Sequence, residues 1–239
     1  MSVSISIAEA YARGRVTFMG LELIICPGAL VPRSETELLG TTAVDILHGM
    51  SLPEARVIDM CCGAGNLACA IAHHVEQSRV WASDLTDRCV ALARQNVTFR
   101  ALPDRVSVHQ GDLFAAFSQQ NLEGTIDVIV CNPPYISETR LHADRAHLLE
   151  FEPREAFAAG PYGISIHQRM IKEAPTFLRP GGVLLFEVGL GQERQVRILF
   201  ERSRAYDGIQ VVQNEAAEGR VVLGYRKTAS AIYPQGESR

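Results

Sequence analysis

The tetrapeptide Asn132-Pro133-Pro134-Tyr135 is the part of the sequence that points most directly to chemistry. It follows the apolar run Ile126–Cys131, which has the composition of a buried strand. An asparagine side-chain oxygen and a proline carbonyl can each accept one hydrogen bond from an –NH₂ group. Two prolines after a strand also serve as a plain stop signal, but that reading leaves Asn132 and Tyr135 unexplained. We therefore predict a site that grips a planar amide or amino group, with Tyr135 packed on its flat face.

A second candidate site is a glycine-containing turn between a predicted strand and a predicted helix. The turn reads Asp59-Met60-Cys61-Cys62-Gly63-Ala64-Gly65-Asn66. Such glycines let the backbone approach a ligand closely, in the crevice at the carboxyl ends of parallel strands. Asp84, followed by Leu85, ends the next predicted strand about 20 residues on, where an acid can accept hydrogen bonds from a ribose. These residues alone also satisfy a dinucleotide fingerprint, and a tight turn without a ligand is the plain alternative.

Two further aspartates favour a nucleoside that carries a charged amino-acid tail. Asp59 would repel a pyrophosphate but suits an ammonium group. Asp112 follows the third predicted strand, where its carboxylate can accept a hydrogen bond from an adenine amino group while the backbone N–H of Leu113 meets a ring nitrogen. Any one of the three aspartates could be an ordinary cap or loop residue, but together they end three consecutive strands.

With these motifs the chain resembles the class I S-adenosylmethionine-dependent methyltransferases. More narrowly, it resembles the HemK/PrmC family of protein glutamine N5-methyltransferases, whose known substrates are peptide chain release factors. The resemblance runs from Tyr11 to Arg226. Besides the glycine turn and Asn132 to Ile136, it rests on Tyr11-Ala12-Arg13-Gly14, on Leu30-Val31-Pro32-Arg33-Ser34-Glu35-Thr36-Glu37-Leu38-Leu39, on Phe151-Glu152-Pro153, and on Glu187-Val188-Gly189 with Gln192. The Asn-Pro-Pro-Tyr element is shared with amino-methylating DNA enzymes, whereas Pro-Arg-x-Glu-Thr-Glu is more particular to the glutamine family.

The resemblance implies S-adenosyl-L-methionine as the cofactor and assigns residues to two parts of one cleft. It places Cys61, Cys62, Gly63, Ala64, Gly65, Asp84, Leu113 and Asn132 in the cofactor site, to which the residue pattern adds Asp59, Leu85 and Asp112. It implies that residues 132–135 grip the substrate amide and that the segment with Arg33 and Glu35 borders the same cleft. Glu152, beside Pro153, is a further candidate for shaping the substrate pocket. The plain alternative for Arg33, Glu35 and Glu37 is a capped helix start with solvated charges.

The sequence departs from the family pattern in three places. Cys61 and Cys62 stand where the family's loop commonly starts with glycine, and a Cys61 side chain would narrow the approach to the methionine end of the cofactor. Leu113 stands where some relatives have an aromatic residue, which weakens stacking on adenine. Relatives that act on release factors usually carry a helical domain ahead of the Tyr-x-x-Gly segment; only ten residues precede Tyr11, so we expect this chain to lack that domain.

Alternating elements should position these residues on a three-layer α/β fold. We predict a Rossmann-like, mostly parallel seven-stranded sheet with its last strand antiparallel, preceded by a short hairpin and helix. The predicted strands are Val57–Met60, Val80–Asp84, Val106–Gln110, Ile126–Cys131, Val183–Val188, Ile209–Gln213 and Arg220–Tyr225. The predicted helices are Glu35–His48, with Ser34 as N-cap and Glu37 completing a capping box, and Leu67–His74, Thr86–Arg100, Ile164–Leu178 and Gln192–Ser203. The last two strands are joined by a connection too short for a crossover helix, so they should be antiparallel neighbours.

Composition bounds the remaining possibilities. The 239 residues are 47% hydrophobic and carry a net charge of −4, which fits one large domain and disfavours stable binding to long nucleic acids. The 6 cysteines form no C-x-x-C pair, so we predict no metal site and a reducing, cytoplasmic location. No run is long and apolar enough to predict a membrane span. We divide the chain into an extension at 1–50, a methyltransferase domain at 51–227 and a flexible tail at 228–239; Val16–Cys26 could add a hairpin to the core or form a homodimer contact.

We therefore predict an N-methyltransferase that uses S-adenosylmethionine. Its acceptor would be a glutamine amide of a protein, or a related amide or amine on a smaller molecule. One alternative is an adenine-N6 or cytosine-N4 methyltransferase of nucleic acid, which shares the amino-gripping element. Another is a non-catalytic module that binds a nucleoside or a nicotinamide cofactor.

Overall fold

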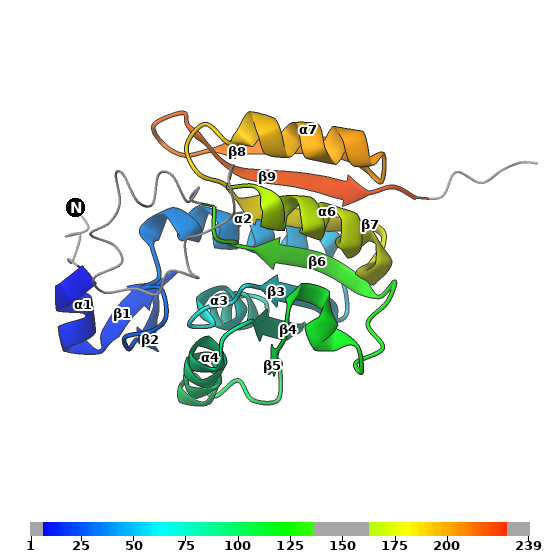
Figure 1. Cartoon of the computed structure of the whole chain (residues 1–239). Helices are drawn as coiled ribbons and strands as arrows, with labels where there is room; N and C mark the ends of the chain where they lie inside the picture. Colours follow the sequence, from blue (N-terminus) through cyan, green and yellow to red (C-terminus); the bar gives the residue numbers. More distant parts are fainter. Residues whose placement is uncertain (1–6, 136–162, 229–239) are drawn as a thin grey trace, which may run out of the picture.

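A single mixed sheet forms the centre of the fold in the computed structural model, which describes residues 7–135 and 163–228. Its strand order is β5-β4-β3-β6-β7-β9-β8 (Figure 1). The strands are β3 (Ala55–Met60), β4 (Ser78–Asp84), β5 (Val106–Gln110), β6 (Ile126–Cys131), β7 (Leu178–Glu187), β8 (Tyr206–Gln213) and β9 (Gly219–Arg226). The predicted seven-stranded sheet of the Rossmann-like class is confirmed, and the last strand is antiparallel to both of its neighbours.

Helices cover both faces of this sheet because the central strands are apolar on both sides. Every residue of β6 is buried. One core, with Val57, Val128 and Leu185, packs against α2 (Ser34–Met50), α3 (Asn66–His74) and α4 (Asp87–Phe99). The other core, with Ile58 and Phe186, packs against η1 (Leu113–Phe117), α6 (Ser165–Phe177) and α7 (Glu193–Ser203).

The chain order creates a crevice in the middle of the sheet. The strands β3, β4 and β5 progress toward one edge, whereas β6 and β7 lie on the other side of β3. Ligands of open α/β sheets bind at such a switch point, outside the carboxyl ends of the strands. The predicted site residues that follow β3, β4, β5 and β6 therefore converge on one end of the sheet.

The last three strands show one confirmed prediction and one difference. The strands β8 and β9 pair antiparallel, as their short connection predicts. Strand β7 begins at Leu178 rather than at Val183, because Leu178 already pairs with Ile126 of β6 before the register shifts. The Pro-Gly-Gly that breaks the apolar pattern therefore lies within the strand, at an irregularity that the sequence alone does not reveal.

The N-terminal part is a short helix and a hairpin that pack on the main domain. Helix α1 (Ile7–Arg13), which the sequence analysis did not predict, precedes β1 (Arg15–Phe18) and β2 (Leu21–Ile24). The turn residues Met19 and Gly20 both have positive φ, as in the tight turns that suit hairpins. The buried amide of Asn96 in α4 holds the hairpin, because it exchanges hydrogen bonds of 2.7 and 2.9 Å with the backbone of Ile24.

The predicted capping box at the start of α2 is wrong. The helix begins at Ser34, and Arg33 takes the N-cap position with an extended backbone and no side-chain cap. The Glu37 carboxylate instead accepts a hydrogen bond of 2.8 Å from the Met19 N–H in the hairpin turn. A tertiary contact thus replaces the local one that the sequence pattern favoured.

Some predictions fall outside the described residues. They include Glu152, the rest of the Phe-Glu-Pro element, Ile136 and nearly all of the tail at 228–239. Among the helices that the structure describes, none has the length and apolar character needed to cross a bilayer. Within the same residues, no group of His, Cys, Asp or Glu side chains is arranged to hold a metal ion.

Candidate active site

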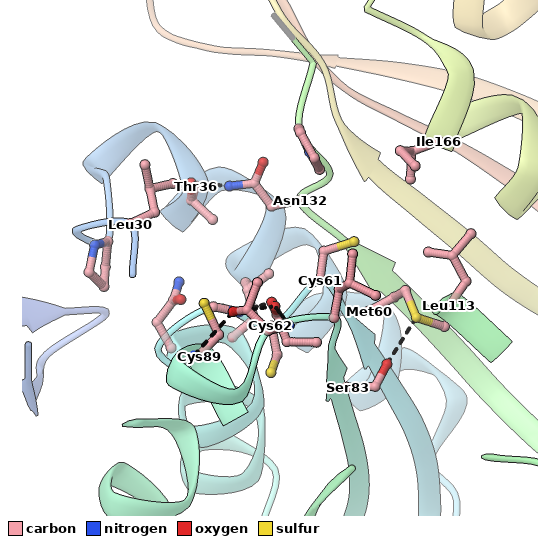
Figure 2. A pocket seen from close by; sticks show the side chains of 18 of the residues that line it. Leu30, Thr36, Met60, Cys61, Cys62, Ser83, Cys89, Leu113, Asn132 and Ile166 are labelled. Carbon is pink, nitrogen blue, oxygen red and sulfur yellow. Dashed lines mark hydrogen bonds between the residues drawn. The ribbon is translucent and has the colours of Figure 1, made fainter. Parts of the chain in front are cut away.

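A cavity opens at the carboxyl ends of the central strands and brings together most of the predicted site. It encloses about 1040 Å³, including the part open to solvent. Figure 2 shows its side chains arriving from the α2 side, from the glycine turn and from the end of β6. The lining residues are Leu30, Pro32, Arg33, Thr36, Met60, Cys61, Cys62, Gly63, Asn66, Leu67, Ser83, Asp84, Leu85, Thr86, Cys89, Gly111, Asp112, Leu113, Asn132, Pro134 and Ile166.

The glycine turn presents its backbone to the cavity. Cys61, Gly63 and Gly65 have φ of 58°, 53° and 76°, in the left-handed region that glycine adopts most readily. The turn is anchored by hydrogen bonds from the Cys62 N–H to the Ser83 carbonyl (2.9 Å) and from the Gly65 N–H to the Cys62 carbonyl (2.7 Å). Cys61 therefore holds a backbone conformation that carries a cost for any side chain.

Asp84 lies at the cavity wall with its carboxylate already oriented. Its Oδ2 accepts from the Gly63 N–H at 3.0 Å, and its Oδ1 accepts from the Thr86 N–H at 3.1 Å. Oδ1 also accepts from the Thr86 hydroxyl at 3.4 Å, whereas Oδ2 keeps a second acceptor position. Asp84 thus joins the glycine turn to the end of β4 and can still accept hydrogen bonds from the hydroxyls of a ribose.

The third strand end supplies Asp112 and Leu113, as predicted from the sequence, but with a partner that the sequence did not indicate. Arg169 in α6 binds the Asp112 carboxylate with two hydrogen bonds of 3.0 and 2.9 Å. Leu113 is buried, beside Ile166 of α6 at the cavity wall. This end of the cavity is therefore apolar, with a carboxylate at its rim.

Asp59 lies behind the glycine turn rather than at the cavity wall. Its Oδ2 accepts from the Ala68 N–H in the first turn of α3 at 2.9 Å, and its buried Oδ1 has no partner within the described residues. Burial raises the pKa of Asp59 from 3.8 to about 8, opposed by the hydrogen bond from Ala68 and increased by the nearby charge of Asp84. Ala64 and Gly65, also predicted as cofactor contacts, likewise lie outside the lining residues.

On the opposite side of the cavity, Asn132 is held by a residue that the sequence analysis did not single out. Its Nδ2 donates to the Thr36 hydroxyl oxygen at 3.0 Å. Figure 2 shows this nitrogen turned toward Thr36 and the amide oxygen turned away from it. The predicted acceptor, Asn132 Oδ1, is thereby left for another donor.

The remaining residues of the tetrapeptide have different surroundings. Pro134 lines the cavity, whereas Pro133 and Tyr135 do not. The Tyr135 hydroxyl donates to Glu187 Oε1 at 3.1 Å, and its carbonyl accepts from Gln192 Nε2 at 2.9 Å. The predicted stacking of Tyr135 on a substrate therefore stays a prediction, because in this structure the tyrosine joins the tetrapeptide to the end of β7.

Glu187 is a buried acid behind the amide-gripping residues. Its side chain lies 3.7 Å from the Arg220 guanidinium in β9. Burial raises the pKa of Glu187, while Thr36, Arg220 and Tyr135 oppose that rise by favouring the charged form. A single acid at the end of the apolar run Val183–Val188 was the signal that could have identified it, since buried charges are seldom placed without partners.

The segment before α2 contributes unevenly. Arg33 lines the cavity, whereas Glu35 is outside the lining residues.

All six cysteines are free thiols. Cys62 is buried, and burial raises its pKa well above the usual value, so it behaves as a small apolar residue rather than a reactive thiolate.

These features fit S-adenosylmethionine. The left-handed turn lets the backbone approach the ligand, Asp84 suits the ribose, and Leu113 with Ile166 offers an apolar wall for adenine. The unpartnered Oδ1 of Asp59 is a buried polar atom behind the turn, and a cation bound nearby, such as the ammonium of the methionine end, would favour the ionised form of this carboxyl.

Comparisons with known proteins agree with this fold. Residues 40–152 match the family model described as a methyltransferase small domain. A methyltransferase from Pyrococcus furiosus superposes with a TM-score of 0.60 at 17% identity, covering 92% of this chain and 94% of that one. A ribosomal protein L11 methylase from Lactobacillus delbrueckii subsp. bulgaricus superposes with a TM-score of 0.58 at 18% identity, covering 85% and 84%. The fold and the site together define a class I, S-adenosylmethionine-dependent methyltransferase.

Sequence relatives identify the family. A release factor glutamine methyltransferase of Moorella thermoacetica is 32% identical over 217 residues, which are 91% of this chain and 74% of the relative. The corresponding enzyme of Streptomyces coelicolor is 35% identical over 193 residues, which are 81% of this chain and 66% of the relative. The chain belongs to the release factor glutamine methyltransferase family, and it spans about two thirds to three quarters of the length of these relatives.

Proposed function

We propose that this protein methylates the side-chain amide nitrogen of a glutamine in a protein substrate, a peptide chain release factor. The observation that carries the proposal is the fixed amide of Asn132, whose Nδ2 is occupied by Thr36 while its Oδ1 is left as an acceptor. The names of the relatives support glutamine in a release factor as the acceptor.

On the cofactor side, the proposal assigns one contact to each strand end. The backbone of residues 61–65 holds the methionine part, with the Asp59 carboxyl behind it. Asp84 accepts hydrogen bonds from the ribose. Asp112 and Leu113 bind adenine through the carboxylate and the backbone N–H, with Leu85 at the same wall. When bound, the cofactor supplies an electrophilic methyl group on a positively charged sulfur.

On the acceptor side, the chain must make a poor nucleophile reactive. An amide nitrogen is weakly nucleophilic because its lone pair is delocalised into the carbonyl. Asn132 Oδ1 and the Pro133 carbonyl each accept one N–H of the substrate amide, which fixes the plane of the amide and favours electron density on nitrogen. Positioning of this kind can lower the activation free energy by roughly 7–11 kcal/mol in the best cases. The nitrogen becomes acidic once it carries the methyl group, and its surplus proton leaves to water.

Methylation of a base amino group in nucleic acid is the alternative that an experiment must distinguish from glutamine methylation. The tetrapeptide alone would suit an adenine or cytosine amino group, but the net charge of −4 gives no overall attraction to a phosphate backbone. The protein is incubated with methyl-labelled S-adenosylmethionine and a cell extract, and the label is then measured in protein, nucleic acid and small molecules. We expect label in protein, no label with Asn132→Ala, and unchanged calorimetric binding of S-adenosylmethionine by that variant. Label in nucleic acid alone, or full turnover by Asn132→Ala, would contradict the proposal.

A further inference from the structure

Thr36 connects the amide-gripping residue to a buried charged pair. The residue is only 1% exposed, yet it lies at the wall of the cavity. It accepts the 3.0 Å hydrogen bond from Asn132 Nδ2 on one side and faces the Glu187 carboxylate on the other. The two residues that it connects are far apart in the sequence, on the segment after β6 and at the end of β7.

The carboxylate of Glu187 is surrounded by donors. Oε1 accepts from the Tyr135 hydroxyl at 3.1 Å and lies 3.7 Å from an Arg220 nitrogen. Oε2 has no hydrogen-bond partner within the described residues, and the Thr36 hydroxyl is close enough to favour the charged form of this carboxylate. An ionised carboxylate can only accept hydrogen bonds, and arginine keeps its charge at all working pH values. The Glu187 carboxylate, whose charged form Arg220 favours, therefore orients the hydroxyl proton of Thr36 toward Glu187.

This arrangement gives the hydrogen bonds a direction. A threonine hydroxyl has one proton and two acceptor positions. When its proton points to Glu187, only its acceptor side can face Asn132, and only the NH₂ end of the Asn132 amide satisfies that side. The amide oxygen must then face the other way. A flipped Asn132 would present its NH₂ group to the –NH₂ of a substrate, and two sets of donors cannot pair.

We infer that Thr36 is a positioning residue, which transmits the charge of the Arg220–Glu187 pair to Asn132 and so fixes the amide oxygen, rather than the amide nitrogen, toward the acceptor nitrogen. The inference rests on the proposed function for its consequence in catalysis. The geometry itself does not depend on which substrate is methylated. Thr36, Glu187 and Arg220 act through Asn132 and need not touch the substrate.

The first test compares two substitutions of Thr36. Thr36→Val keeps the shape and removes the hydroxyl, whereas Thr36→Ser keeps the hydroxyl. For Thr36→Val we expect kcat for glutamine methylation to fall by at least about tenfold, since small losses of orientation at a reacting centre are costly. Its Kd for S-adenosylmethionine should stay within about threefold, and Thr36→Ser should restore most of kcat. Thr42→Val is the matched control, because Thr42 lies on the same helix with its hydroxyl bonded to the Leu38 carbonyl, away from the cavity.

The second test asks whether Thr36 and Glu187 act together. Glu187→Gln keeps the size of the side chain but offers both a donor and an acceptor, so it no longer forces the direction of the Thr36 hydroxyl. We expect it to lower kcat as well, and to add little in the Thr36→Val background, because groups in one hydrogen-bond chain show non-additive effects. Independent, fully additive losses would contradict the relay.

The third test needs no substrate. The side-chain NH₂ of Asn132 is assigned by nuclear magnetic resonance, and its hydrogen exchange is compared in the wild type, Thr36→Val and Thr42→Val. We expect slow exchange in the wild type and in Thr42→Val, and exchange at least about tenfold faster in Thr36→Val, since protection comes from the hydrogen bond. Unchanged exchange in Thr36→Val overturns the inference. A wild type that methylates no glutamine, yet shows this pattern, overturns the proposed function and leaves the positioning role standing.

Discussion

The two halves of the cavity are built in different ways. The proposed cofactor half consists of the backbone of residues 61–65 and the carboxylates of Asp84 and Asp112, all within one continuous β-α-β-α-β stretch. The acceptor half uses side chains that come from separate parts of the chain: Thr36 from α2, Asn132 after β6 and Glu187 from β7. The first half is a surface for binding, and the second is a hydrogen-bond network that sets the direction of one amide.

This difference implies that substitutions in the two halves should affect different steps. Loss of a cofactor contact should weaken binding and leave the chemistry nearly intact once the cofactor is saturating. Loss of an acceptor contact should leave cofactor binding intact and slow the chemistry. The substitutions below test that division.

The largest effect is expected in the acceptor half. Asn132→Ala should lower kcat by at least about 100-fold, comparable to removing one preorganised hydrogen-bonding group from other active sites. Its Kd for S-adenosylmethionine should change by less than about threefold. Steady-state kinetics and calorimetry check the two parts, and a large loss of cofactor affinity would place Asn132 in the binding half instead.

The next effect is expected in the cofactor half. Asp84→Ala should weaken S-adenosylmethionine binding by about 10- to 100-fold, since hydrogen bonds to a charged group contribute about 1.5–3 kcal/mol. At saturating cofactor, kcat should recover to within a few-fold of the wild type. Asp84→Asn should lose less affinity for S-adenosylmethionine than Asp84→Ala because it keeps one acceptor oxygen. A kcat that stays low at saturation would show that the two halves are not separable.

A buried group behind each half should give the apoprotein a characteristic pH dependence. Burial raises the pKa of Asp59 to about 8, so its folded-state proton stabilises the protein at low pH and that stability is lost as pH rises toward 8. Burial lowers the pKa of His167 to about 4, opposed by its contact with the Glu187 backbone, so its contribution is present above about 6.5 and is lost as pH falls toward 4. The two trends oppose each other up to about pH 6.5, and above that the Asp59 trend is no longer offset by His167.

We therefore expect the free energy of unfolding to fall by up to about 2 kcal/mol between pH 6.5 and 8, from a slope of about 1.4 kcal/mol per pH unit and proton. Urea titrations across this range measure it. Asp59→Asn should remove the fall, and His167→Gln should leave it in place. A wild-type profile that is flat above pH 6.5 would show that Asp59 keeps an ordinary pKa.

The smallest effect is expected at the glycine turn. Cys61→Gly removes a side chain from a residue with φ of 58°, where the left-handed conformation costs a non-glycine residue roughly 1–2 kcal/mol. It also widens the approach to the methionine end of the cofactor. We expect S-adenosylmethionine to bind a few-fold more tightly, as measured by calorimetry, with kcat nearly unchanged. Weaker binding would show that the Cys61 side chain contacts the cofactor favourably.

The same contrast explains what the sequence could predict. The ends of β3, β4 and β5 carry local signals, because a glycine turn and two aspartates directly follow apolar runs, and the structure places Cys61, Asp84 and Asp112 around one cavity. Asn132 was also identifiable, since its neighbours in sequence are unusual. The antiparallel pairing of the last two strands followed from the shortness of their connection.

The relay around Asn132 was not predictable in the same way. Thr36 and Asn132 are 96 positions apart, and Tyr135 and Glu187 are 52 apart, so no local pattern records their contacts. The local pattern predicted that Glu37 caps its own helix, whereas in the structure its side chain accepts a hydrogen bond from the Met19 N–H in the hairpin. Partners of this kind depend on how helices dock on the sheet, which propensity and periodicity do not determine.

The most direct test of the account is the identity of the methylated atom. The protein is incubated with a purified bacterial release factor and S-adenosylmethionine, and the product is mapped by tandem mass spectrometry. We predict one added methyl group on the side-chain nitrogen of a single glutamine, and none when Asn132→Ala replaces the wild type. Methylation on an oxygen, a sulfur or a backbone position, or an unmodified release factor beside a methylated nucleic acid, would contradict the account.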